Sequence, residues 1–248
     1  TEPHVIQVLL LLGIGALVSP PLLRILGTRG FYLIALFPLA GLLWVFANWP
    51  SAHAEPVTHS STWVDKLDLN IDLRFDTLTA VLSVLILGVG ALVLVYCANY
   101  FDEMRNRIAV FGGELVAFAA AMFGLVISDN MLVMFVFWEA TTVLSFMLVG
   151  FYRMLATSRR AATQALLVTT FGGLAMLVGV IMLGERCGSY LLSEVVENPP
   201  SGVFASVAVA LVLVGAISKS ASVPFHFWLP GAMAAPTPVS AYLHAAAM

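Results

Sequence analysis

The sequence predicts an all-α, multi-pass membrane protein. Of its 248 residues, 60% are apolar and only 10% are charged, whereas about a quarter of the residues of a soluble domain carry a charge. The apolar residues gather in runs of about 20, the length that a helix needs to cross a bilayer about 30 Å thick. The net charge of −3 leaves no basic surface for a nucleic acid. Partners are therefore expected among lipids and other membrane chains.

Seven apolar segments have about the length of a spanning helix. They cover residues 5–26, 31–49, 76–98, 108–127, 130–151, 161–184 and 202–219. An eighth segment begins near Pro236 or Thr237 and has run for only about 12 residues at Met248, which is too short to cross a bilayer. We therefore expect residues 1–248 to form one membrane domain, the amino-terminal fragment of a longer subunit.

The segment 50–75 is the one sizeable polar connection, and we expect it to be an external loop. Toward its end, apolar residues alternate with polar ones: Leu67, Leu69, Ile71, Leu73 and Phe75 are interleaved with Asp68, Asn70, Asp72 and Arg74. A repeat of two residues is typical of a strand. The pattern predicts a short external β segment that lies on the helices and exposes its charged face.

The distribution of basic residues predicts the orientation. Seven of the eleven Lys and Arg residues lie in alternate connections: Arg24, Arg29, Arg105, Arg107, Arg153, Arg159 and Arg160. Short cytoplasmic loops are enriched in such residues, so these connections are expected to face the cytoplasm and the amino terminus the exterior. Cys97 and Cys187 then lie on opposite sides and cannot pair. With no C-x-x-C pair, we expect neither a metal site nor a cofactor held by this chain.

Glu139 is the first of three charges within predicted spans. A charge near the centre of a membrane helix costs about 2.5–3.5 kcal/mol, and Glu139 lies about 14 Å into its helix at about 1.5 Å per residue. One interpretation is a group that carries or steers ions. The other is a protonated carboxyl satisfied by the hydroxyl of Thr142, one turn away.

Lys219 is the second, and it is the only formal charge between Glu197 and Met248. It either snorkels from the end of the seventh helix or lies beside a helix break inside the membrane. The break is favoured by four prolines within fifteen residues: Pro224, Pro230, Pro236 and Pro238. Unwound backbone in a membrane often marks a transport site. Lys219 and Glu139 would lower their common insertion cost by pairing.

His226 and His244 belong to the same stretch. Imidazole gains and loses a proton near neutral pH and so suits a proton relay. Haem ligands and structural histidines are the alternatives. Glu114, in the fourth segment, is expected to lean toward Arg105 or Arg107.

Two smaller features have mainly structural interpretations. Asp129 is expected to cap the helix that follows it, with a role in cation entry as the alternative. Gly172 and Gly173 are expected to form a close helix-packing face.

Two stretches carry a resemblance to a known family. Residues 128–139, from Ser-Asp-Asn to Trp-Glu, and residues 219–244 resemble the signatures of antiporter-like membrane subunits. That family includes the A and D subunits of the Mrp multisubunit sodium/proton antiporters and the proton-pumping subunits of respiratory complex I. The motifs Phe-His-Phe-Trp-Leu-Pro and Pro-Val-Ser-Ala-Tyr-Leu-His are most similar to the Mrp A subunits. Gly231 and Ser222 depart from the acidic residue and glutamine common at these positions, so the loop polarity differs.

The resemblance implies one subunit of a secondary transporter, not an enzyme. It would exchange Na⁺, or another monovalent cation, for H⁺ within a hetero-oligomeric complex of a bacterial plasma membrane. By motif position, Glu139 and Lys219 would form a charged pair in a proton half-channel, and His244, with His226 beside the break, would relay protons.

Three alternatives remain open at this point. One is a redox-driven proton-pumping subunit of complex I or of a membrane hydrogenase. Another is a membrane scaffold whose charges only fix helix packing. A membrane enzyme is least favoured, because no nucleophile–base pair, metal cluster or phosphate loop is visible in the sequence.

Overall fold

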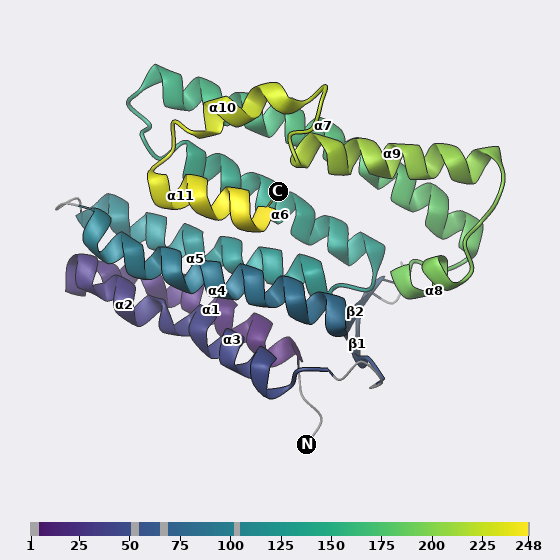
Figure 1. The fold of residues 1–248 in the computed structure, drawn as a ribbon, viewed down its shortest axis with the longest axis horizontal. Helices are drawn as coiled ribbons and strands as arrows, with labels where there is room; N and C mark the ends of the chain where they lie inside the picture. Colours follow the sequence, from purple (N-terminus) through teal and green to yellow (C-terminus); the bar gives the residue numbers. More distant parts are fainter. Residues whose placement is uncertain (1–4, 51–54, 65–68, 102–104, 248) are drawn as a thin grey trace.

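The computed structural model describes residues 5–50, 55–64, 69–101 and 105–247. Within these ranges the chain is mostly helical and carries a small two-stranded sheet at one end of the helices (Figure 1). Several helices are long and apolar enough to cross a membrane. The prediction of a multi-pass, helical membrane protein is confirmed at this level, and the number of spans stays a prediction.

The first two predicted segments form a helical hairpin. Helix α1 spans Val5–Leu26, a 3₁₀ turn η1 spans Gly27–Arg29, and α2 (Gly30–Ile34) and α3 (Leu36–Ala47) run back beside α1 (Figure 1). Gly27 has φ of +63°, a left-handed conformation that glycine adopts at no steric cost. The chain can therefore reverse within three residues.

Four long helices follow. They are α4 (Thr77–Tyr100), α5 (Arg105–Ile127), α6 (Met131–Val149) and α7 (Ala156–Cys187). Helix α5 packs against α1, α4 and α6 and buries Phe111, Phe118 and Phe123 fully. Helix α7 is longer than the predicted segment 161–184. Its first turns contain Arg159 and Arg160, and this charged stretch is not apolar enough to be predicted as part of a membrane helix.

The sheet pairs a predicted strand with one that the alternation did not predict. Strand β2 (Leu69–Phe75) lies antiparallel to β1 (Val57–Val64), with Val57 opposite Phe75. Leu73 and Phe75 are buried against the helices, which agrees with the predicted apolar face. Part of the predicted strand, Leu67 and Asp68, lies outside the described residues. Strand β1 is mostly polar and lacks the alternation that identified β2.

The last part of the chain is broken as the prolines predicted. A short helix α8 (Leu192–Glu197) leads to α9 (Val203–Lys219), which ends at Lys219. A 3₁₀ turn η3 (His226–Trp228), α10 (Leu229–Ala232), α11 (Thr237–Tyr242) and a π-helical turn η4 (Leu243–Ala247) follow. Helices α9 and α10 lie one after the other along α7, and α11 turns back beside α4 and α6 (Figure 1).

Each proline of the break stands where its ring is tolerated. Pro230 and Pro238 occupy the first turn of α10 and α11, and Pro236 is the cap of α11. A first-turn proline removes no helical hydrogen bond, because the first N–H groups of a helix have no partner within it. Pro224 lies in the non-helical stretch between α9 and η3. The prolines therefore separate short helical pieces and do not kink a continuous helix.

Candidate functional site

Lys219 is buried at the junction of α9 and α6. Only 7% of the residue is exposed. Its Nζ donates to the Trp138 carbonyl oxygen at 3.0 Å and to the hydroxyls of Thr141 and Thr142. It also lies 4.4 Å from the centre of the Trp138 ring, a position favourable for a cation–π interaction. The ammonium points into the helix bundle, so the snorkelling interpretation of this lysine is wrong.

Glu139 lies in the same turn of α6 as the groups that hold Lys219. Its Oε1 atom is buried and has no hydrogen-bond partner among the described residues. The hydroxyl of Thr142, suggested as a partner for this carboxyl, donates to the carbonyl of Trp138 at 3.1 Å instead. A carboxyl satisfied by Thr142 is therefore not what this structure contains.

Lys219 and Glu139 are neighbours without a direct ion pair in this conformation. Among the residues that the structure describes, the ion pair found within 4.0 Å is between Arg74 and Asp76. The ammonium of Lys219 instead has neutral oxygens as its partners. Pairing of Lys219 with Glu139 stays a prediction.

Two glycines of α7 admit this arrangement. A Cβ built on Gly172 would overlap the hydroxyl of Ser218 in α9, and a Cβ built on Gly173 would overlap Oε1 of Glu139. The indole Nε1 of Trp138 also lies against Gly173 and has no hydrogen-bond partner in the described chain. The predicted close-packing face is confirmed, and it brings both α9 and the Glu139 turn of α6 against α7.

Trp228 holds the broken end of α9. Its Nε1 donates to the Ser218 carbonyl oxygen at 3.0 Å, one of the last carbonyls of a helix, which lack partners within the helix. Ala221, just past the end of α9, has φ of +50°. This role of Trp228 was not predicted from the sequence, although the indole N–H of a buried tryptophan needs an acceptor.

Tyr242 was also missed. It is 1% exposed, and its hydroxyl donates to the Ile86 carbonyl oxygen of α4 at 3.0 Å. Gly90 leaves room for it, because a Cβ there would lie 2.8 Å from the phenol oxygen. Tyr242 thus ties α11, the helix that follows the break, to α4.

The two histidines do not join the Lys219 site by hydrogen bonds. Both His226 and His244 are exposed. Nδ1 of His244 lies 2.6 Å from the Ser240 carbonyl oxygen, one turn back along the chain. Within the described ranges, no hydrogen bond links either imidazole to Lys219 or Glu139. The histidine relay stays a prediction.

Glu114 lies near the middle of α5 and lines a separate cavity. The residue is 9% exposed, and its Oε1 lacks a hydrogen-bond partner in the described chain. The cavity has a volume of about 210 Å³ and is also lined by Arg107 and Arg153. No ion pair joins Glu114 to Arg107 among the described residues, and the side chain of Arg105 lies outside them, so the leaning toward Arg105 or Arg107 stays a prediction.

Asp129 does not cap α6, contrary to the prediction. Asn130 is the cap and accepts from the N–H groups of Leu132 and Val133. Both carboxylate oxygens of Asp129 instead accept from Ser193, one from its N–H at 2.9 Å and one from its hydroxyl at 2.6 Å. Both Asp129 and Asn130 are suitable cap residues by type, so sequence alone did not choose between them.

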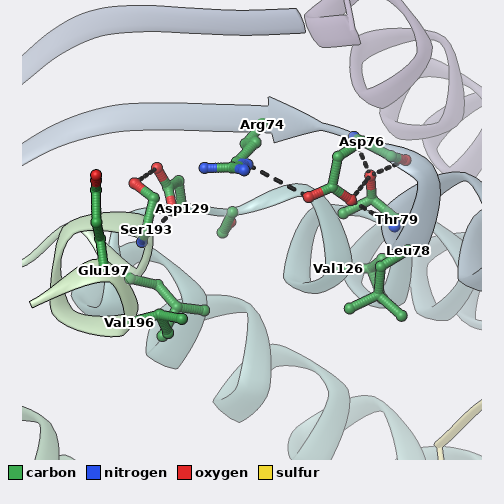
Figure 2. Close-up of a pocket in the computed structure, with 11 residues that line it drawn as sticks. Arg74, Asp76, Leu78, Thr79, Val126, Asp129, Ser193, Val196 and Glu197 are labelled. Atoms are coloured by element: carbon green, nitrogen blue, oxygen red, sulfur yellow. Dashed lines mark hydrogen bonds and ion pairs between the residues drawn. The ribbon is translucent and has the colours of Figure 1, made fainter. Parts of the chain in front are cut away.

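Asp129 and Ser193 lie beside Asp76 around a cavity of about 510 Å³ (Figure 2). Asp76 caps α4 through the N–H of Thr79 at 3.0 Å and pairs with Arg74 at 3.3 Å. Partial burial alone would raise the pKa of Asp76, but the Thr79 hydrogen bonds and the Arg74 charge outweigh burial and lower that pKa. Asp76 and Asp129 thus both have hydrogen-bond partners at this end.

Comparison with known proteins identifies the family. Residues 128–248 match the family described as NADH:quinone oxidoreductase/Mrp antiporter, TM. Residues 62–111 match the one described as NADH-Ubiquinone oxidoreductase (complex I), chain 5 N-terminus. The chain belongs to the family of antiporter-like membrane subunits. Both motif stretches that suggested it lie within the matched residues 128–248.

Two relatives show the level of similarity. A probable K(+)/H(+) antiporter A/B subunit of Rhizobium meliloti is 46% identical over 192 residues, which cover 75% of this chain and 19% of the relative. A putative antiporter subunit mnhA2 of Staphylococcus aureus is 38% identical over 230 residues, which cover 91% of this chain and 29% of the relative. The chain therefore spans less than a third of the length of these antiporter subunits.

Two solved structures have the same fold. A chain of the Mrp complex from Dietzia sp. DQ12-45-1b superposes with a TM-score of 0.90 at 35% identity, covering 98% of this chain and 26% of that one. A chain of the membrane-bound sulfane sulfur reductase, an archaeal respiratory membrane complex, gives 0.81 at 19% identity, covering 96% and 49%. The second likeness concerns the fold alone.

Proposed function

We propose that this chain forms part of the ion path of a multisubunit antiporter that exchanges Na⁺, or another monovalent cation, for H⁺. The complex would lie in a bacterial plasma membrane, with the amino terminus of this chain outside. The observation that carries the proposal is the burial of the Lys219 ammonium in the α6 turn that contains Glu139, at the end of a broken helix. The antiporter names of the two relatives support it.

In this proposal Lys219 has two positions. In the first, its ammonium is held by the Trp138 carbonyl and the Thr141 hydroxyl, as in this structure. In the second, the side chain turns to the carboxylate of Glu139, which has an unpartnered oxygen within the same turn. A proton or cation that reaches Glu139 neutralises or occupies the carboxylate and returns Lys219 to the first position.

The break after Lys219 suits such a switch. Lys219 is the last residue of the 17-residue helix α9, and the negative end of a helix dipole stabilises a cation there. Lys219 is held by neutral oxygens, so leaving them separates no opposite charges. His244 would then receive the proton on the way to the rest of the subunit.

The test uses everted membrane vesicles that carry the intact complex. Lys219→Ala should abolish the cation-dependent collapse of a preset proton gradient, while native gels show an unchanged complex. Arg186→Ala, which removes an exposed cation from the last turn of α7, is the matched control and should transport normally. Undiminished transport by an assembled Lys219→Ala complex would contradict the proposal and favour the scaffold interpretation.

A second candidate is a redox-driven proton-pumping subunit. It is favoured by the match of residues 62–111 to the complex I family. The same vesicles separate the two functions, because an antiporter responds to added cation without an electron donor. A proton flux that needs an electron donor and ignores the cation would support the redox-driven pump.

A further inference from the structure

A basic trough lies where α6 ends and α7 begins, away from the Lys219 site along both helices. Two cavities of about 480 and 630 Å³ meet there and share Arg159 and Thr163. Arg153 lines the first cavity and Arg160 lines the second. We refer to the two cavities together as the arginine trough.

Arg159 and Arg160 have no acidic partner in the described chain, whereas Arg153 also lines the cavity that contains Glu114. Neither cavity is lined by an Asp or a Glu. The ion pair found among the described residues involves none of these arginines. Nη1 of Arg159 donates to the Arg153 carbonyl oxygen at 2.7 Å, which fixes the guanidinium without neutralising it. Among the described residues, no acid therefore compensates the positive charges of Arg159 and Arg160.

The surroundings of the trough are those of a membrane boundary. Met154 and Leu155 follow Arg153 directly and are 84% and 54% exposed. Exposed apolar side chains beside arginines are typical of the level where acyl chains meet headgroups. Phe146, Met147 and Ala162 give the first cavity an apolar wall, and Leu167 does the same in the second.

We propose that the arginine trough binds one anionic phospholipid. The phosphate lies between Arg159 and Arg160, and an acyl chain lies along Phe146 and Met147. Guanidinium groups form strong charge-assisted hydrogen bonds with phosphate oxygens, and basic pockets between membrane helices bind anionic headgroups. A free phosphate would use the arginines but not the apolar wall, so the two parts of the trough together favour a lipid.

The experiment uses the full-length protein in its purified, delipidated complex. Phosphatidylglycerol or phosphatidylcholine is added in increasing amounts, and retained lipid is quantified by mass spectrometry. Each near-surface arginine contributes about fivefold to anionic-lipid binding. Arg159→Gln/Arg160→Gln should therefore weaken phosphatidylglycerol binding by about 25-fold at the tightest site and leave phosphatidylcholine unaffected.

The matched control is Arg24→Gln/Arg29→Gln. It removes two exposed arginines at the same end of the helices, outside the trough, and should change the binding less than twofold. Equal loss in both variants would mean general surface charge and would overturn the proposal. Full displacement of the lipid by glycerol phosphate would identify a phosphate site. Unchanged lipid retention with loss of complex assembly in the trough variant would identify an acidic protein partner. Either a phosphate site or a protein partner would overturn the proposal of a lipid site.

Discussion

The start and the middle of α6 differ in whether their polar groups have hydrogen-bond partners. At the start, Asn130 caps the helix, and the carboxylate of Asp129 accepts two hydrogen bonds from Ser193. In the middle, Lys219 is buried against the Trp138 carbonyl, and Oε1 of Glu139 and Nε1 of Trp138 lack partners in the described chain. Both regions contain charged groups; those at the start have hydrogen-bond partners, whereas in the middle an oxygen of Glu139 has none in the described chain.

In the proposed function, the difference separates a structural charge from one that takes part in transport. A satisfied network stabilises a single arrangement, whereas an unpartnered buried oxygen costs about 1–3 kcal/mol and needs a compensating reason. The proposed second position of Lys219 would supply such a reason, because it would give Glu139 a partner for part of the transport cycle. Neutralising an acid should therefore have very different effects at the two places.

The largest expected effect comes from exchanging the two acids separately for amides. Glu139→Gln keeps the shape of the side chain and removes its charge, so we expect cation-dependent proton transport to fall at least tenfold, with normal assembly. Asp129→Asn keeps an acceptor for Ser193, so transport should stay within about twofold of the wild type. Both variants are measured in the everted vesicles used for Lys219→Ala. Equal losses in the two variants would remove the distinction between the start and the middle of α6.

A glycine exchange tests the same region sterically and should have an intermediate effect. Gly173→Ala places a methyl group against Oε1 of Glu139, and overpacking of this kind costs about 1–3 kcal/mol. We expect a lower melting temperature of the complex and a several-fold loss of transport. Gly13→Ala is the matched control, because its Cβ would meet nothing within 4 Å. It should leave both quantities unchanged, and a Gly173→Ala complex with wild-type transport would show that Glu139 does not need this space.

Much of the fold could be predicted because membrane helices carry a strong signal of their own. The long apolar runs, the prolines after Lys219 and the alternation from Leu69 to Phe75 each specify local structure, and each is observed. Strand β1 was not predicted because its residues are largely polar and its pairing with β2 depends on contacts between residues distant in sequence. The predicted cap of α6 was wrong because two neighbouring residues, Asp129 and Asn130, are both chemically suited to that position.

The candidate site was predictable as a set of residues but not as a geometry. Isolated charge singled out Glu139 and Lys219, because a charge in a membrane needs a reason. The partners of Lys219 are a backbone carbonyl and two threonine hydroxyls, and such groups occur throughout the sequence without any distinguishing pattern. Trp228 and Tyr242 likewise reach backbone carbonyls, which no side-chain motif can indicate.

The smallest expected effect concerns Asp76, beside the start of α6, and how its contribution to stability depends on pH. Asp76 accepts from Thr79 and pairs with Arg74, and together these lower its pKa despite partial burial. A lowered pKa means that the ionised carboxylate stabilises the fold above about pH 4, its ordinary range, and that this contribution is lost as the pH falls through the folded-state value. The melting temperature of the wild-type complex should therefore exceed that of Asp76→Asn by a constant small margin from about pH 7 to 5, and the margin should shrink below about pH 4. Asp76→Ala should lose the cap as well, which is worth about 1 kcal/mol at a helix start, at every pH. A margin that grows on acidification would mean that burial disfavours the ionised form of Asp76. The contrast between Asp76 and Glu139 would then not hold.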